Sequence, residues 1–365
     1  MENIYFTPGP TQLHPAVKGF LHDALKKDIC SISHRSQIFR ELYVEAVTNI
    51  KKLMGTPEEF EVFFLASATE IMERIIQSCV HSKSFHVVNG AFSKRFFDIA
   101  CMLKKNAEQA EYNHGADVEL CELKVPDDAE LICITQNETS TGFWIPPIDF
   151  KKLTKTNKDS LLAVDVVSSA PCAALDFAVV DLAFFSVQKC FGLPSGLGVL
   201  IAGPESLKKA QDLESRNVNP MSFHSLVSLA ECGAKEQTYE TPNVLGIYLI
   251  AKMASWMLEY GIERIRLDME AKQELLKSAI SEMDGLSFFV ENKRFQSPTV
   301  STLSSQRDLK ALRANLAAEG LHVGSGYGDF KDKQIRIANF PSHSLLDFER
   351  LVAALKKYSM HLGDR

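Results

Sequence analysis

Residues 183–203 read AFFSVQKCFGLPSGLGVLIAG and place Lys189 between two strongly apolar runs, with a turn rich in glycine and proline directly after it. Short apolar runs bounded by turn residues are typical of buried β-strands. An ammonium group beside such strands is costly unless it is used, because burial lowers the pKa of a lysine. An unprotonated lysine amine can form a Schiff base with a carbonyl compound. Lys189 is therefore a candidate catalytic residue, and a solvated lysine in an exposed turn is the alternative.

An acidic residue ends another apolar run upstream. Residues 161–165 read LLAVD, so Asp165 stands at the end of one candidate strand and Lys189 near the end of the next. In open α/β sheets, ligands bind at the carboxyl ends of the strands. Pyridoxal 5'-phosphate (PLP) requires such a pair, because the lysine carries its aldehyde and the acid keeps its pyridine nitrogen protonated. The two residues together predict a PLP site.

The alternation of apolar runs and helical stretches extends over much of the chain. The candidate strands are residues 62–66, 84–88, 131–135, 161–165, 182–187 and 198–202. Helical stretches are expected at residues 69–80, 92–104 and 147–155. Continuously apolar strands that alternate with helices indicate a parallel sheet covered on both faces, so we expect an α/β fold.

Breaks in this pattern suggest the domain organisation. The expected parts are an N-terminal arm (1–14), a large PLP-binding domain (15–242) and a smaller C-terminal domain (243–365). The arm should be irregular because proline and glycine cluster at residues 7–10. The segment 214–221 is a polar break, and a long helical stretch over 243–283, interrupted at Gly261, should lead into the last domain. Its expected strands lie near 286–290, 299–303 and 334–338, and its helices near 307–319 and 342–360.

The composition excludes several functional classes. The chain has 365 residues, 45% hydrophobic and 24% charged, with a formal net charge of −6, which suits a globular protein of two domains. No basic block predicts nucleic-acid binding, and no apolar stretch reaches the length of a membrane span. The N-terminus lacks the pattern of a signal peptide, so we expect a cytoplasmic protein. The eight cysteines form no C-x-x-C pair, which argues against a metal site and favours reduced thiols.

A candidate anion site lies at residues 67–69. Ser67, Ala68 and Thr69 follow the strand 62–66 and open a helix. Small or polar residues at a helix N-terminus can bind an anion through free backbone N–H groups and the helix dipole. An ordinary serine or threonine cap is the alternative. Beside Asp165 and Lys189, the segment favours a site for the phosphate of PLP.

Read together, the motifs resemble those of the class V aminotransferases of PLP fold type I. The matching segments are TPGP (7–10), SHRSQIF (33–39), SATEIME (67–73), NGAFSKRF (89–96), NETSTG (137–142), DVVSS (165–169), VQKCFGLPSG (187–196), TPNVLGIYL (241–249) and RIANFP (336–341). The resemblance implies a large domain with a mostly parallel seven-stranded sheet and a smaller C-terminal α/β domain. It also implies a homodimer with shared active sites.

The resemblance assigns a role to each matching position. Lys189 would hold PLP and move protons, Asp165 would pair with the pyridine nitrogen, and Thr139 would donate to the phenolic oxygen. Phe92 would stack on the ring, although a plain core phenylalanine is the alternative. The other cofactor-binding positions would be Ser67, Ala68, Thr69, Val167, Gln188 and, from the second subunit, Thr241. Residues 137–139 could equally form a polar turn.

The same resemblance implies a substrate-binding set. Arg336 would bind the substrate α-carboxylate, and Gly9, His34 and Arg35 would complete the substrate site. Arg336 lies between Ile335 and Ile337, so on a strand its side chain faces away from theirs. A planar guanidinium can bind a carboxylate through two parallel hydrogen bonds, which suits this role. A surface arginine on a strand is the alternative.

The expected reaction is transamination between a small L-amino acid and a 2-oxo acid, with ping-pong kinetics. Residues 335–344 and the lysine motif resemble the phosphoserine aminotransferases of serine biosynthesis, which use 3-phosphohydroxypyruvate and glutamate. Residues 7–12, 34–39, 67–73 and 138–142 resemble the alanine– or serine–glyoxylate (or pyruvate) aminotransferases. We favour the first branch, although Glu70 and the glycine-rich residues 324–328 replace basic residues of that branch.

Two other classes of function compete with transamination. A protein of this fold could bind PLP as a regulator without activity, but the complete set of Asp165, Lys189 and Arg336 argues against that. A lyase or desulfurase is the other class. A desulfurase needs a nucleophilic cysteine on a downstream loop, and no cysteine follows Cys232.

Overall fold

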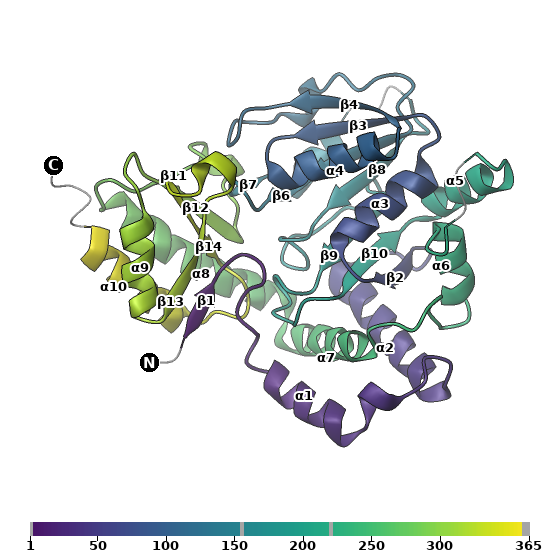
Figure 1. The fold of residues 1–365 in the computed structure, drawn as a ribbon, viewed down its shortest axis with the longest axis horizontal. Helices are drawn as coiled ribbons and strands as arrows, with labels where there is room; N and C mark the ends of the chain where they lie inside the picture. Colours follow the sequence, from purple (N-terminus) through teal and green to yellow (C-terminus); the bar gives the residue numbers. More distant parts are fainter. Residues whose placement is uncertain (1–2, 154–156, 219–221, 360–365) are drawn as a thin grey trace.

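A computed structural model describes residues 3–153, 157–218 and 222–359, whose two larger β-sheets lie in two lobes (Figure 1). A third sheet has only the two short strands β6 (Asn137–Glu138) and β7 (Phe143–Trp144). The larger sheet has seven strands in the order β2-β10-β9-β8-β5-β3-β4. These strands are β2 (Glu61–Leu65), β3 (Lys83–Val88), β4 (Asn106–Glu111), β5 (Leu131–Thr135), β8 (Leu161–Asp165), β9 (Leu182–Ser186) and β10 (Gly198–Ala202). Strand β10 runs antiparallel to both β2 and β9, and all other neighbouring strands in this sheet are parallel. The predicted seven-stranded, mostly parallel sheet of an α/β fold is therefore confirmed.

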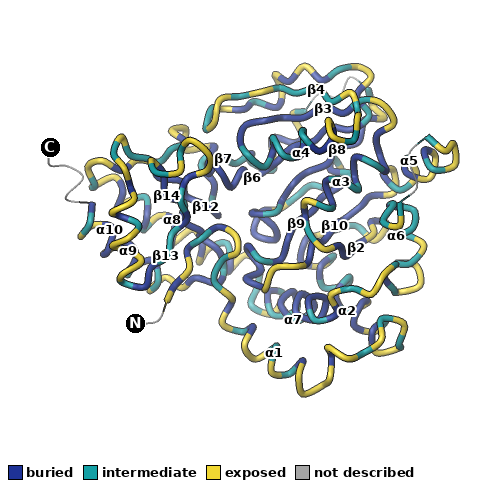
Figure 2. The backbone as a smooth tube through the Cα atoms, in the orientation of Figure 1, coloured by how far each residue is buried: buried dark blue, intermediate teal, exposed yellow. Residues whose placement is uncertain are grey.

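Helices cover both faces of this sheet because the strands are apolar on both sides. Along β2, Val62 and Phe64 join one buried cluster and Phe63 and Leu65 join another, as the twofold period of a strand requires. One face is covered by α2 (Gln37–Met54) and α7 (Val244–Tyr260). The other face is covered by α3 (Ala68–Cys79), α4 (Ala91–Met102), α5 (Pro204–Ser215) and α6 (Leu226–Gly233). Figure 2 shows the central strands as buried, whereas α1 (Val17–Lys26) is exposed along much of its length.

The smaller sheet has five strands in the order β1-β13-β14-β12-β11. They are β1 (Ile4–Phe6), β13 (Leu321–Ser325), β14 (Gln334–Ala338), β12 (Val300–Ser304) and β11 (Ser287–Phe288). Helices α8 (Ile262–Ser281), α9 (Lys310–Ala318) and α10 (Leu345–Ser359) pack on it around a third apolar cluster. The division of the chain after residue 242 stays a prediction.

The expectation of an irregular arm is wrong for its first described residues. Ile4 and Phe6 are buried and Tyr5 between them is exposed, so this short segment has the alternation of a half-buried strand. It pairs in parallel with β13, with Ile4 opposite Leu321. The proline-rich residues 7–10 then end the strand. Strand β1 therefore belongs to the smaller sheet, and the chain then crosses to the other lobe.

Other elements differ from the expectations mainly at their ends. The expected helix at 147–155 is a 3-10 helix, η3 (Pro147–Lys152), and its last two expected residues lie outside the described residues. The long helical stretch breaks at Gly261, as expected, where φ is +96°. The helix expected at 342–360 begins at Leu345, and Met360 lies outside the described residues, as do 219–221 of the polar break. The remaining short elements are η1 (Ile29–Ser31), η2 (Leu120–Glu122), η4 (Lys293–Phe295) and η5 (Gly328–Phe330). Among the described helices, none combines the length and apolar character that a membrane span requires.

Candidate active site

Lys189 and Asp165 lie together at the carboxyl edge of the large sheet. Asp165 ends β8, Lys189 follows β9, and these two strands are parallel neighbours. Both residues line a cavity of about 120 Å³. Nine of the positions expected to bind the cofactor line it: Ser67, Ala68, Thr69, Phe92, Thr139, Asp165, Val167, Gln188 and Lys189. Residues from five separate segments of the chain therefore converge on one site.

The Lys189 ammonium group is buried inside this cavity. The residue is 6% exposed, its Nζ donates to Thr139 Oγ1 at 3.2 Å, and Nζ lies 5.1 Å from the centre of the Phe92 ring. Burial, with a smaller contribution from the Arg336 charge, lowers the pKa of Lys189 to about 8, although the Asp165 carboxylate opposes this shift. A substantial fraction of the amine is therefore unprotonated slightly above neutral pH, which is the nucleophilic form.

The Asp165 carboxyl group is also buried and needs a cation. Burial is the main reason why its pKa rises to about 7, and the negative charge of Glu138 adds to this shift. The backbone N–H of Val167 donates to Asp165 Oδ1 at 2.8 Å and opposes the rise. A cationic group placed against this carboxylate would keep it ionised, because an opposite charge favours the charged form.

Glu138 fixes the position of Phe92, a role that the sequence did not reveal. Its fully buried carboxylate accepts from the backbone N–H groups of Phe92 (3.1 Å) and Ser93 (2.9 Å) at the start of α4. A carboxylate is stabilised there by the free N–H groups and the helix dipole. Gly90 makes room for it, since a Cβ at that position would lie 2.3 Å from Glu138 Cγ.

The segment 67–69 opens α3, as the motif suggested. Ser67 is the N-cap, and its Oγ accepts from Glu70 N at 3.1 Å, so the ordinary capping interpretation holds for this side chain. Ala68 N donates to Ser186 Oγ at 3.1 Å. Ser67, Ala68 and Thr69 nevertheless line the cavity, and the first turn of the helix faces it. Capping and anion binding are therefore compatible at this helix end.

Two further expected residues contact the cavity from other parts of the chain. A Cβ on Gly9 would lie 2.8 Å from Lys189 Cε, so glycine allows the arm to pass directly over the lysine. Arg336 on β14 is half-buried, and its Nη1 donates to Thr139 O at 3.2 Å. Its Nε donates to Ser325 O at 2.7 Å, and burial lowers the pKa of the guanidinium. Arg336 thus connects the small sheet to the wall of the Lys189 cavity.

A sequence model of the family described as aminotransferase class-V matches residues 5–329. This chain belongs to that family. It is 43% identical to a crystallised phosphoserine aminotransferase from Cytophaga hutchinsonii, with a TM-score of 0.95 over 98% of this chain and 99% of that one. A phosphoserine aminotransferase from Corynebacterium glutamicum (strain R) is 24% identical over 360 residues, 96% of this chain and 93% of that protein.

A structure of an alanine–glyoxylate aminotransferase from Nostoc sp. shares the fold at 21% identity, with a TM-score of 0.81 over 98% of this chain and 95% of that one. The protein is therefore a PLP-dependent aminotransferase of fold type I. The expected family, fold type, cofactor and class of reaction are all confirmed.

Buried polar groups that lack a partner in this aminotransferase indicate that the cavity fits PLP. Gln188 Oε1 is buried and has no hydrogen-bond partner among the described residues, although it lines the cavity. A buried acceptor without a partner is costly, and a ligand donor would satisfy it. The Asp165 carboxyl group contacts no cation among the described residues. The protonated ring nitrogen of the cofactor would supply that cation.

Besides Gly9 and Arg336, which contact residues of this cavity without lining it, three expected residues of the aminotransferase do not line it. Arg35 is exposed, and its guanidinium donates to Gln237 Oε1 at 2.5 Å and to Tyr239 O at 3.2 Å. Thr241 is also exposed and follows Tyr239 by two residues. His34 precedes Arg35, and burial, with a contribution from the Arg35 charge, lowers its pKa. We call His34, Arg35 and Thr241 the outer cluster.

One basic residue that lines the cavity, Arg95, was not predicted from the sequence. The Arg95 guanidinium carbon lies 5.2 Å from the centre of the Phe92 ring. Arg95 comes three residues after Phe92 in α4, and residues at this spacing share a helix face. Once Phe92 was assigned to the site, this spacing could have revealed Arg95.

Proposed function

We propose that this aminotransferase is a phosphoserine aminotransferase of serine biosynthesis, which converts 3-phosphohydroxypyruvate and glutamate to phosphoserine and 2-oxoglutarate. The observation that carries the proposal is the 43% identity to a phosphoserine aminotransferase over 98% of this chain. The likeness to the alanine–glyoxylate enzyme, at 21% identity, is a likeness of fold. Curated relatives at 24–26% identity also carry the name phosphoserine aminotransferase.

In this proposal, Lys189 holds the cofactor and moves the proton between the substrate Cα and the cofactor. PLP supplies a ring that accepts electrons when the Cα proton leaves. The lowered pKa of Lys189, about 8, suits a group that must both take up and release a proton near neutral pH. Asp165 supports this step by stabilising a positive charge on the ring nitrogen.

Arg336 is proposed to bind the α-carboxylate of each substrate. A guanidinium has five N–H donors, and two of those of Arg336 are used by Ser325 O and Thr139 O. Three donors remain for a carboxylate. The two existing bonds hold the guanidinium against the wall of the Lys189 cavity, so a substrate bound there would present its Cα to the lysine.

The outer cluster is proposed to complete the cavity of a second subunit in a homodimer. Arg35 and Thr241 are exposed and lie outside the cavity of their own chain, which is what a shared site requires. Thr241 would then contact the cofactor phosphate of the partner. Arg35 and His34 would contact the distal phosphate or carboxylate of the substrate. The proposal places the dimer in the cytoplasm, where unpaired cysteines are usual.

A half-reaction assay tests the substrate. Holoenzyme is mixed separately with phosphoserine, glutamate, alanine or serine, and the loss of the cofactor absorbance is followed. Phosphoserine and glutamate should react roughly 10- to 100-fold faster than alanine, because a charge-assisted hydrogen bond contributes about 1.5–3 kcal/mol. The Arg35→Ala variant should lose this preference while its rate with alanine stays unchanged. A native enzyme that prefers alanine or serine would contradict the proposal and favour the glyoxylate branch.

A further inference from the structure

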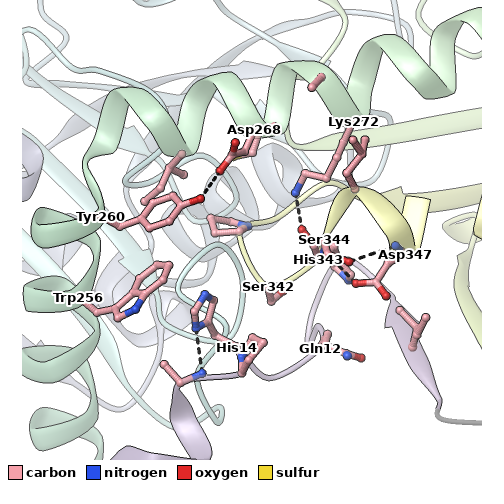
Figure 3. A pocket seen from close by; sticks show the side chains of 18 of the residues that line it. Gln12, His14, Trp256, Tyr260, Asp268, Lys272, Ser342, His343, Ser344 and Asp347 are labelled. Atoms are coloured by element: carbon pink, nitrogen blue, oxygen red, sulfur yellow. Dashed lines mark hydrogen bonds between the residues drawn. The ribbon is translucent and has the colours of Figure 1, made fainter. Parts of the chain in front are cut away.

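A second cavity, of about 720 Å³, lies between the N-terminal arm, the junction of α7 and α8, and the loop that follows β14. Figure 3 shows Gln12 and His14 from the arm, Trp256 and Tyr260 from α7, and Lys272 from α8 around it. Its volume falls in the range of about 300–1,000 Å³ that is usual for small-molecule sites. None of its lining residues lines the Lys189 cavity.

The cavity contains a buried positive charge without a counter-ion. Lys272 is 2% exposed, and its Nζ donates to Phe340 O at 2.9 Å and His343 O at 2.8 Å. Carbonyl oxygens satisfy two of its three donors but do not neutralise its charge. Lys272 makes no ion pair with any carboxylate in the described part of the chain. Its Nζ also lies 5.6 Å from the centre of the Phe348 ring. A buried charge that no opposite charge contacts is unfavourable, and burial lowers the pKa of Lys272 to about 8.

The two carboxylates at the edge of the cavity are already engaged elsewhere. Asp268 accepts from the hydroxyl group of Tyr260 at 2.7 Å, and Asp347 accepts from the backbone N–H of Ser344 at 2.8 Å. Both raise the pKa of Lys272 without contacting it. Arg350 also lines the cavity and supplies another positive charge. These four charged side chains carry no net formal charge, but Asp268 is exposed and Asp347 and Arg350 are half-buried, so Lys272 is the one of the four whose charge is buried.

A second polar group inside the cavity also lacks a partner. Ser342 is 4% exposed, lines the cavity, and its Oγ has no hydrogen-bond partner among the described residues. In Figure 3 it lies between Lys272 and the arm. The aromatic wall is formed by Trp256, whose ring stacks on Tyr260 at 5.0 Å and lies 4.3 Å from His14. A ligand could thus meet polar groups at one end and an aromatic surface at the other.

We propose that this cavity binds a small organic carboxylate with a flat apolar body. The carboxylate would accept hydrogen bonds from Lys272 Nζ and Ser342 Oγ, and the apolar body would pack against Trp256. The site also adjoins the catalytic loop, because a Cβ on Gly192, three residues after Lys189, would lie within 3.2 Å of both His14 and Ser342. A ligand there would contact the same residues that pack against the Lys189 loop.

Calorimetric titration of the full-length holoenzyme with biphenyl-4-carboxylate tests the proposal. The carboxylate should bind, and the neutral biphenyl-4-carboxamide should bind about 10- to 100-fold more weakly, because it lacks the charge-assisted contacts. Lys272→Met should weaken binding of the carboxylate by a similar factor. Lys277→Met is the matched control, since Lys277 lies on the same helix and pairs with Glu274. It should leave binding unchanged.

Lys272→Met removes the donor of two buried carbonyl groups and could misfold for that reason. A second variant therefore tests the same cavity without changing Lys272. Ala271 is exposed and lines the cavity, so Ala271→Phe should fill the space without removing any buried contact. It should reduce binding at least tenfold as well. Absence of binding by the carboxylate, or equal binding of the carboxamide, would overturn the proposal. So would binding that survives both Lys272→Met and Ala271→Phe but is lost in Arg336→Ala, because the probe would then occupy the active site.

Discussion

Replacing Arg336 by alanine should weaken transamination of every amino acid by a similar factor. The guanidinium has three N–H donors left after its bonds to Ser325 O and Thr139 O, enough for a bidentate contact to the α-carboxylate. Two charge-assisted hydrogen bonds contribute about 1.5–3 kcal/mol each. Their loss should lower kcat/KM by roughly 10² to 10⁴. The ratio between phosphoserine, glutamate and alanine should change little, because all three carry the same α-carboxylate.

The same substitution should move the pH dependence of the reaction. The Arg336 charge is one of the causes that lower the pKa of Lys189, so removing it should raise that pKa above its value of about 8. The reaction rate rises with pH as Lys189 loses its proton, and this rise should therefore occur at higher pH in the variant. Arg336→Lys keeps the positive charge but lacks the planar guanidinium. It should therefore leave the pH–rate profile in place while it binds the substrate α-carboxylate much more weakly.

Single-turnover rates over a range of pH provide the assay. Arg313→Ala is the control, because Arg313 lies on α9 and its guanidinium pairs with Asp332. This variant should behave as the native enzyme does. The reasoning is refuted if Arg336→Ala impairs phosphoserine alone, or if kcat/KM for all three amino acids stays within about threefold of the native values.

Three other predictions concern the cofactor and the dimer. Asp165→Asn should retain PLP but slow the half-reaction by roughly 10² or more, because the ring nitrogen loses its negative partner; unchanged single-turnover rates would exclude that role. In the apoprotein, burial lowers the pKa of Lys189 from 10.5 to about 8, so between these values the unfolded state binds more protons and native stability rises with pH. Urea unfolding should therefore find the Lys189→Met apoprotein more stable by about 3 kcal/mol below pH 8, with a difference that shrinks toward pH 10.5; a constant difference would count against a buried amine. Mixing inactive Lys189→Ala subunits with Arg35→Ala/Thr241→Ala subunits should restore roughly a quarter of native activity through heterodimers, and no recovery despite proven exchange would argue against shared sites.

The large sheet could be predicted because burial leaves a strong signal in its strands. Every residue of β5, β8, β9 and β10 is buried, and their sequences are apolar except for the last residue of β5, β8 and β9. Their order also placed Asp165 and Lys189 at one edge of the sheet, since parallel strands present their carboxyl ends together. The central pair of the site could therefore be found without any structure.

Edge strands and buried polar contacts were less visible. The edge strand β4 has the polar sequence NAEQAE and pairs only with β3, so no apolar run marks it. Strand β13 is only partly buried, and β1 has three residues. The contact of Glu138 with α4 depends on a distant helix N-terminus, which spacing along the chain does not show. Gly9 was expected at the site, but the backbone hydrogen bonds from Thr11 to Gln188 and from His14 to Gly192 were not visible for the same reason.

The central claim is that Lys189 is the residue that carries the cofactor. Borohydride reduction of the holoenzyme, followed by peptide mass spectrometry, tests it directly. The assay must distinguish Lys189 from Lys272, because Lys272 is also buried and burial lowers its pKa to about 8 as well. Of these two lysines, only Lys189 lies beside Asp165 in a cavity with the unsatisfied Gln188. We predict that the reduced cofactor is found on the peptide that contains Lys189, and a label on Lys272 or any other lysine would contradict this account.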